Sequence, residues 1–136
     1  MEARKVAAKI ILEIIQGKAS LATSLPRHFQ NIQDDSQKAL IQEICYGVSR
    51  WFFRLDFIAK QLLEKPLKQK DQDIYVLILM GLYQLIFMRI PDYACVSEIV
   101  AAIPSTKKQW AKGLVNAVLR NFIREEVTLL KKSDQN

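Results

Sequence analysis

The stretch that decides the fold is IYVLILMGLYQLIFM, residues 74–88, in which one glycine and one glutamine interrupt an apolar run. A helix that is apolar on every side must be surrounded by other apolar groups. The run is shorter than the roughly 20 residues that a membrane-spanning helix needs. Charged residues also flank it, with Asp71 and Asp73 before and Arg89 after. We therefore expect a fully buried central helix and no membrane partner.

Gly81 stands in the middle of this run. A glycine inside a helix costs about 1 kcal/mol relative to alanine. We interpret it as a point where a neighbouring helix approaches closely. The alternative, a cofactor pressed against the backbone, has no supporting residues nearby.

The rest of the chain also has helical spacing of apolar residues, and its four glycines and four prolines separate segments rather than cluster. Ser20, the Asp34–Ser36 segment and Asp56 are predicted to cap helices, and Pro66 is predicted to stop one. No period-two alternation long enough for a strand occurs. The expected fold is all-α, with about seven helices covering residues 2–16, 20 to between 26 and 30, 36–53, 56–65, 74–88, 93–103 and 105–124.

Length and composition are those of one globular domain: 136 residues, 50% hydrophobic and 25% charged. The net charge of +6 permits a polyanionic partner such as RNA or DNA, although solubility alone explains it equally well. Cys45 and Cys95 lie in apolar runs without metal-ligand spacing. They indicate small buried thiols in a reduced, cytoplasmic protein.

The sequence contains no recognisable catalytic or cofactor-binding motif. The glycines are isolated, so no glycine-rich loop is available to hold a phosphate or a nucleotide cofactor. His28 is the single histidine, and we expect it at the surface rather than in a catalytic or zinc site. The adjacent carboxylates at 34–35 and 125–126 diverge on a helix and suit caps or solvated charge. We expect this chain alone to have no catalytic residues, cofactor or metal.

Basic residues form the positive signal. Each cluster has the chemistry to contact phosphate oxygens, but each also suits a solvated face. Trp110 lies within the last cluster, where it either stacks on an unpaired base or packs partly buried. The clusters are Arg4, Lys5 and Lys9; Arg50 and Arg54; Lys65, Lys68 and Lys70; and Lys107, Lys108 and Lys112.

The segment GLVNAVLRNF, residues 113–122, places Asn116 and Arg120 four apart within an apolar stripe. A buried amide must be hydrogen-bonded, and a buried guanidinium needs a carboxylate. We expect a structural polar cluster in which Glu98, on the preceding helix, pairs with Arg120. Contact of Asn116 and Arg120 with RNA or with a further domain is the alternative.

Four motifs in order carry a resemblance to a known family: EICYGVSRWFFRLD (43–56), KPLKQKD (65–71), MGLYQLIFMRIPDYACVSEIV (80–100) and KGLVNAVLRNF (112–122). Together they resemble the N-terminal domain of the bacterial ribosomal RNA small-subunit methyltransferase B family, also called Sun or Fmu. That domain has the fold of the antitermination factor NusB. The resemblance implies two small packed helical sub-bundles in an RNA-binding domain at 1–124. The tail EEVTLLKKSDQN, residues 125–136, either extends the last helix or begins a linker, and the resemblance implies a linker toward a catalytic domain absent from this chain.

The resemblance implies that the family's catalytic domain, absent here, uses S-adenosylmethionine and paired cysteines to methylate carbon 5 of a cytosine. Because Cys45 and Cys95 lie in helical motifs of the N-terminal domain, the resemblance gives them no catalytic role. It implies ribosomal RNA and the catalytic domain of the same polypeptide as partners. By resemblance Arg4 and Lys5 are RNA-facing candidates, and by charge and placement so are Arg50, Lys68 and Lys70. Two alternatives stay open: a free-standing NusB-type antitermination factor that binds RNA with a ribosomal protein, and a helical protein-docking module.

Overall fold

The computed structural model describes residues 2–104 and 106–135. Over these residues the chain forms seven α-helices, one 3₁₀ turn and one π-helical segment, without a strand. The predicted all-α class with about seven helices is therefore confirmed. The elements are α1 (Ala3–Ile15), α2 (Leu21–Phe29), α3 (Asp35–Arg50), α4 (Phe52–Leu62), η1 (Gln69–Asp71), α5 (Gln72–Tyr83), η2 (Gln84–Met88), α6 (Asp92–Ala101) and α7 (Ala111–Asp134).

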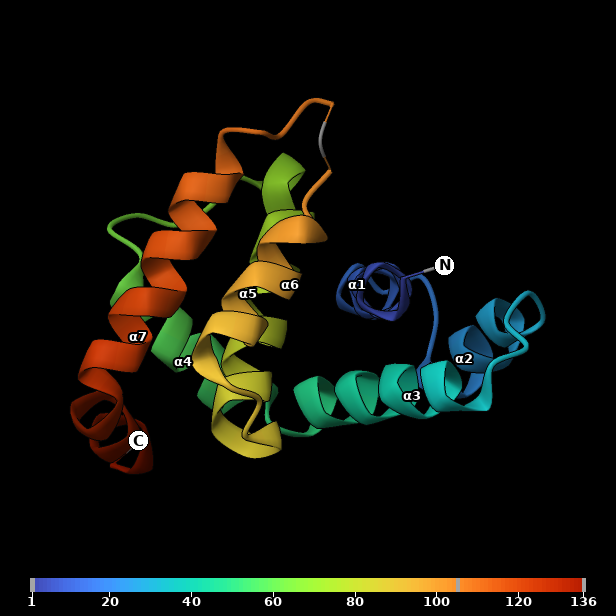
Figure 1. Cartoon of the computed structure of the whole chain (residues 1–136), viewed down its shortest axis with the longest axis horizontal. Helices are drawn as coiled ribbons and strands as arrows, with labels where there is room; N and C mark the ends of the chain where they lie inside the picture. The colour runs from blue at the N-terminus through green and yellow to red at the C-terminus, as the bar shows by residue number, and fades with distance from the viewer. Residues whose placement is uncertain (1, 105, 136) are drawn as a thin grey trace.

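The helices form two groups that share α5 (Figure 1). Helices α1, α2 and α3 contact one another on one side of the molecule. Helices α4 and α6 both contact α7 on the other side. Helix α5 contacts α1 and α3 as well as α4, α6 and α7, so one helix holds both groups together.

Burial of α5 follows from its sequence. Every side chain from Ile74 to Tyr83 is buried except that of Tyr75, which is partly buried and donates its hydroxyl to Asp56. Among the described residues, one helical stretch, 69–88, is long and apolar enough to match a membrane span by length and composition. Because 67% of its most apolar window is buried inside the fold, it has the pattern of a core helix.

Two glycines allow close approach to this central helix. A Cβ added at Gly81 would lie 2.8 Å from Cδ2 of Leu119, so the predicted close helix approach is confirmed. A Cβ added at Gly47 of α3 would lie 2.0 Å from Cζ of Tyr83. The Tyr83 ring has little room to move, because its hydroxyl donates to Glu43 Oε2 at 2.6 Å and its face stacks on Phe87.

Local cap signals were reliable where no tertiary contact competed with them. Ser20 and Asp34 cap α2 and α3 as predicted, each accepting a backbone N–H of the first turn. The prediction for Asp56 was wrong: α4 already begins at Phe52, after a break at Trp51. Asp56 lies inside α4, where it accepts the Tyr75 hydroxyl and pairs with Lys60 at 2.9 Å.

The last helix also differs from the expectation. It begins at Ala111 rather than near 105, and the predicted start at Ser105 lies outside the described residues. It continues past a non-helical residue, Glu125 (φ −112°, ψ 18°), to Asp134. Of the two alternatives for the tail, the structure shows extension of the last helix over 126–134, with Leu129 buried. That a linker to a catalytic domain begins at 125 stays a prediction.

Gly47→Ala is expected to lower the free energy of unfolding by about 1–3 kcal/mol, because the new methyl group overlaps the Tyr83 ring. Gly113 is the matched control: it lies in α7 with nothing within 4 Å of an added Cβ. Gly113→Ala should therefore raise stability, by up to about 1 kcal/mol. Urea denaturation measures both variants, and equal stabilities would contradict the close packing at Gly47.

Candidate functional site

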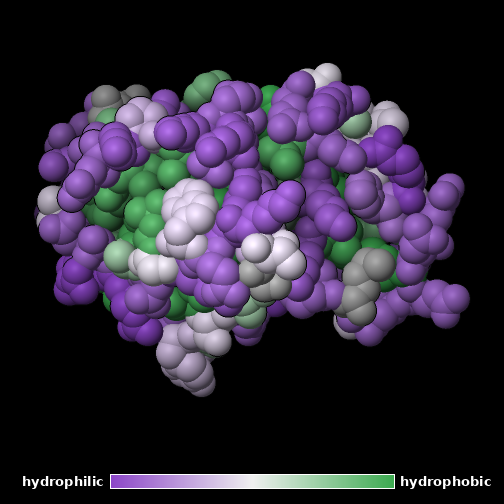
Figure 2. Space-filling model, turned by 90° about the horizontal axis from the view of Figure 1, so that it is seen from above, coloured by the Kyte–Doolittle hydropathy of each residue, from purple (hydrophilic) through white to green (hydrophobic). Residues whose placement is uncertain are grey.

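A groove runs between the connection that follows α4 and the first half of α7. Its volume is about 810 Å³. From above, the α4–α7 side of the surface shows an apolar hollow ringed by hydrophilic side chains (Figure 2). Its apolar lining is Leu62, Leu63, Pro66, Leu67, Trp110, Leu114, Ala117 and Val118; its polar lining is Glu64, Lys65, Lys68, Lys70, Asp71, Lys107, Lys108 and Asn121. We call it the lysine groove.

The lysines of this groove come from two separate parts of the sequence. Lys65, Lys68 and Lys70 follow α4, whereas Lys107 precedes α7. The two connections meet because α4 packs beside α7 and both helices pack on α5. These four lysines are exposed, and none forms an ion pair within the part of the chain that the structure describes. Lys68 and Lys70 were predicted candidates; the sequence did not show that Lys107 joins them.

Lys108 has a different role, because its ammonium is partly buried and is bound by groups of the protein itself. Its Nζ lies 2.7 Å from Asp73 Oδ1 and 3.3 Å from Asp71 Oδ1, and it donates to the Lys70 carbonyl at 2.7 Å. Burial lowers the pKa of Lys108, but the bonds to Asp73 and Asp71 outweigh burial and raise it above its ordinary value. Lys108 therefore clamps the connection before α7 to the start of α5.

The two tryptophans lie in contrasting environments. Trp110 lines the groove with 51% of its surface exposed. Trp51 is partly buried and stacks on Phe87, with ring centroids 4.8 Å apart. Of the two readings for Trp110, the structure therefore supports an exposed ring beside lysines rather than a packing residue.

The other predicted candidates lie outside the lysine groove. Lys5 is exposed on α1. Arg4, beside it, is only 12% exposed in its side chain: Nε donates to Gln84 Oε1 at 2.9 Å, and Nη2 lies 2.5 Å from Glu98 Oε2. Arg50 ends α3 with its guanidinium 5.6 Å from the Trp51 ring centroid. RNA contact by these residues stays a prediction.

The predicted pairing of Glu98 with Arg120 was wrong. Arg120 is exposed, and its Nε donates to Asn116 Oδ1 at 3.2 Å along the outer side of α7. Glu98 pairs instead with Arg4, because its side chain reaches toward α1 rather than α7.

The buried polar group of this region is Gln84, which is 0% exposed. Its Oε1 accepts from Arg4 and its Nε2 donates to the Met80 carbonyl at 3.3 Å. Sequence reasoning missed this buried polar group, although Gln84 is the one glutamine in the apolar run 74–88 and could have indicated it.

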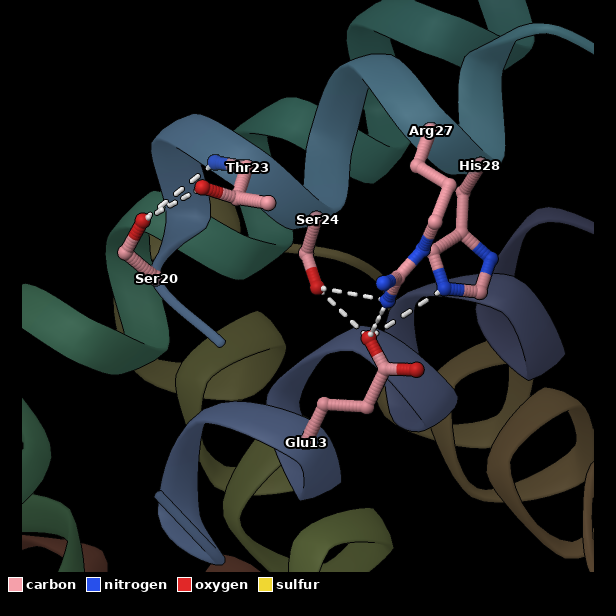
Figure 3. Close-up of polar contacts among 6 residues, drawn as sticks. All are labelled: Glu13, Ser20, Thr23, Ser24, Arg27 and His28. Carbon is pink, nitrogen blue, oxygen red and sulfur yellow. Dashed lines mark hydrogen bonds and ion pairs between the residues drawn. The ribbon is translucent and has the colours of Figure 1, made fainter. Parts of the chain in front are cut away.

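A second polar cluster joins α1 to α2 around Glu13 (Figure 3). Glu13 Oε1 accepts from Ser24 Oγ at 2.5 Å and Arg27 Nη2 at 2.7 Å, and lies 3.3 Å from His28 Nε2. Although serine, histidine and glutamate meet here, the buried Ser24 hydroxyl donates to the carboxylate and not to the histidine. The serine–histidine contact of a catalytic triad is therefore not formed in this cluster. His28, expected at the surface, is partly buried.

The two cysteines and the acidic side chains of the described residues form neither a reactive thiol site nor a metal site. Cys45 and Cys95 are free and fully buried, as predicted. Burial raises the pKa of each thiol to about 12, so the reactive thiolate is scarce at neutral pH. No group of three His, Cys, Asp or Glu side chains suited to a metal gathers in residues 2–104 and 106–135.

Fold and sequence place the chain in a known family. Residues 1–124 match the NusB family, and the chain belongs to that family. The resemblance found from the four motifs is thereby confirmed.

The chain is similar to proteins named ribosomal RNA small subunit methyltransferase B. It is 45% identical over 130 residues to that of Pseudomonas putida, covering 96% of this chain and 30% of the relative. It is 46% identical over 138 residues to that of Pasteurella multocida, covering 100% and 30%. A protein of Coxiella burnetii with the same name, qualified as probable, is 44% identical over 130 residues, covering 96% and 29%. The chain thus spans about 30% of the length of these curated relatives.

Arg4→Ala is expected to lower the free energy of unfolding by about 1–3 kcal/mol, because it leaves the buried Gln84 Oε1 without its donor. Glu98→Ala should cost less, since the Glu98 side chain is 43% exposed. Arg120→Ala is the control and should leave stability unchanged. Thermal denaturation ranks the three variants; a larger loss for Arg120→Ala than for Arg4→Ala would contradict this assignment.

Glu13→Gln is expected to destabilise the fold at neutral pH but not in acid. The Ser24 hydroxyl above all, with His28 and Arg27, holds the pKa of Glu13 below its ordinary 4.5 despite burial. A carboxylate with a lowered folded-state pKa stabilises the fold above the unfolded-state pKa, and this contribution disappears as pH falls through the folded-state value.

Denaturation of wild type and Glu13→Gln from pH 7 to pH 3 measures this effect. The difference in stability should be largest near pH 7 and shrink below pH 4.5. Gln61→Ala, which changes an exposed side chain without an ionisable group, is the control and should show no such trend. A difference that stays constant with pH would contradict the ionic role of Glu13.

Proposed function

We propose that this chain is the RNA-binding, substrate-positioning N-terminal domain of an S-adenosylmethionine-dependent small-subunit ribosomal RNA (cytosine-C5) methyltransferase of the cytoplasm, and that it is not catalytic by itself. The support is the family membership of residues 1–124 together with relatives that carry the methyltransferase name and are about three times as long. The partners are ribosomal RNA and the catalytic domain of the same polypeptide.

The observation that carries the RNA-binding part is the lysine groove. Lys65, Lys68 and Lys70 meet Lys107 at one surface without intramolecular ion pairs among the described residues. Side chains of this kind bind phosphate oxygens and release counterions from the nucleic acid, which makes affinity depend strongly on salt. The overall charge of +6 adds a weaker attraction over the whole surface.

The described residues do not fit S-adenosylmethionine. Gly47, Gly81 and Gly113 stand singly within helices and Gly17 follows the end of α1, so the chain offers no glycine-rich turn for the cofactor. We assign cofactor binding and methyl transfer to the catalytic domain. We assign RNA binding to the N-terminal domain described here. Among residues 2–104 and 106–135, no feature that we describe favours the antitermination factor with a ribosomal protein partner, or the protein-docking module, over this proposal.

Lys68→Glu/Lys70→Glu is expected to weaken binding of the ribosomal RNA target by roughly tenfold or more at low salt, because it reverses two phosphate-binding charges. The control double variant, Lys18→Glu/Lys131→Glu, has the same net charge but changes exposed lysines outside the groove. Fluorescence anisotropy at two salt concentrations measures both, and Lys5→Glu/Lys9→Glu tests the α1 face in the same way.

Equal losses for the groove variant and its control would mean that overall charge, and not the groove, binds RNA. Wild-type protein that binds no RNA at low salt, or binds without salt dependence, would contradict the proposed function.

A further inference from the structure

The lysine groove combines two chemistries that a phosphate-binding surface alone does not need. Lysines surround it, but its floor is apolar, with Leu62, Leu67, Leu114 and Val118 among the lining residues. Trp110 adds an indole ring that is half exposed to solvent. Exposed aromatic surface next to several ammonium groups is the arrangement by which proteins hold unpaired nucleotides.

A duplex cannot use both parts of this groove. In duplex RNA the bases are stacked inside the helix, so phosphates and 2′-hydroxyls are what a protein surface meets. An unpaired nucleotide offers a phosphate and, a few ångströms away, a free base face. Only the unpaired form therefore matches the lysines and the apolar floor together.

We infer that the lysine groove binds single-stranded RNA, with a base stacked on Trp110 and the flanking phosphates held by Lys68, Lys70 and Lys107. The inference rests on the proposed function for the identity of the polymer, and it adds the class of RNA and the contact that selects it. Lys65 extends the same basic rim along the strand.

Charge distinguishes RNA from an apolar protein segment as the occupant. Five lysines and two carboxylates line the groove. One of the carboxylates, Asp71, is buried and paired with Lys108. Glu64 is thus the one carboxylate left to face the other four lysines, so the groove presents an excess of positive charge to any ligand.

The two tryptophans allow a direct measurement of the stacking contact. Trp51 packs against Phe87 away from the groove, so Trp51→Phe leaves Trp110 as the sole tryptophan of the chain. Titrating this variant with a single-stranded oligouridylate of about ten nucleotides should quench Trp110 emission to saturation. A duplex of the same length should bind at least tenfold more weakly and quench little.

Trp110→Leu in the wild-type background then tests the contribution of the ring. Loss of one base stack should weaken single-strand binding, measured by anisotropy of labelled RNA, by about 5- to 150-fold. Duplex binding should not change. Trp51→Leu, which removes the packed indole, is the matched control. The folded fraction of this variant should bind single-stranded RNA with the affinity of the wild type.

The outcomes separate this inference from the proposed function. Single-strand affinity that survives Trp110→Leu, or equal quenching by single strand and duplex, would overturn the stacking contact while RNA binding stands. Equal quenching by polyglutamate would show a surface for acidic protein and overturn the inference as well. Absence of binding to either RNA by the wild-type protein at low salt would overturn both proposals.

Discussion

Helix α5 has to be covered by protein on every side, and the arrangement of the other helices follows from that need. Helices α1 and α3 cover one part of its surface, and α4, α6 and α7 cover the remainder. Two of these neighbours approach so closely that side chains on α7 and α5 fill the places where Gly81 and Gly47 lack a Cβ. The exclusion of water from one apolar segment therefore fixes how two small groups of helices are joined.

The lysine groove is a consequence of this packing. Once α4 and α7 lie against the same central helix, the connection that leaves α4 and the one that enters α7 meet near the start of α5 (Figure 1). Both connections are rich in lysine, and Lys108 of one binds the Lys70 carbonyl and Asp71 of the other. A surface suited to an anionic polymer thus arises from two segments that carry no binding motif by themselves.

The central helix, the all-α class and the caps at Ser20 and Asp34 could be predicted, because periodicity and short-range hydrogen bonds determine them. The groove could not, since it depends on how α4 and α7 are placed. Arg4 shows the same limit: adjacency in the chain suggested Arg120 as the partner of Glu98, whereas the fold brings Arg4 of α1 within ion-pair distance of Glu98 on α6. The start of α7 escaped prediction because Lys108 lies in the connection before the helix, where it pairs with Asp71 and Asp73, and a contact so distant in the chain leaves no local signal.

Because of Lys108, the affinity of the lysine groove for an anion and the width of the groove depend on different charges. It joins the two walls through ion pairs whose side chains are mostly buried, at 21% exposure for Lys108 and 8% for Asp71. Dissolved salt screens exposed charges far more than buried ones. Raising the ionic strength therefore screens the charges of the rim lysines more than it screens the ion pairs of Lys108. We therefore expect rising salt to weaken the attraction for an anion before it separates the two connections that Lys108 joins.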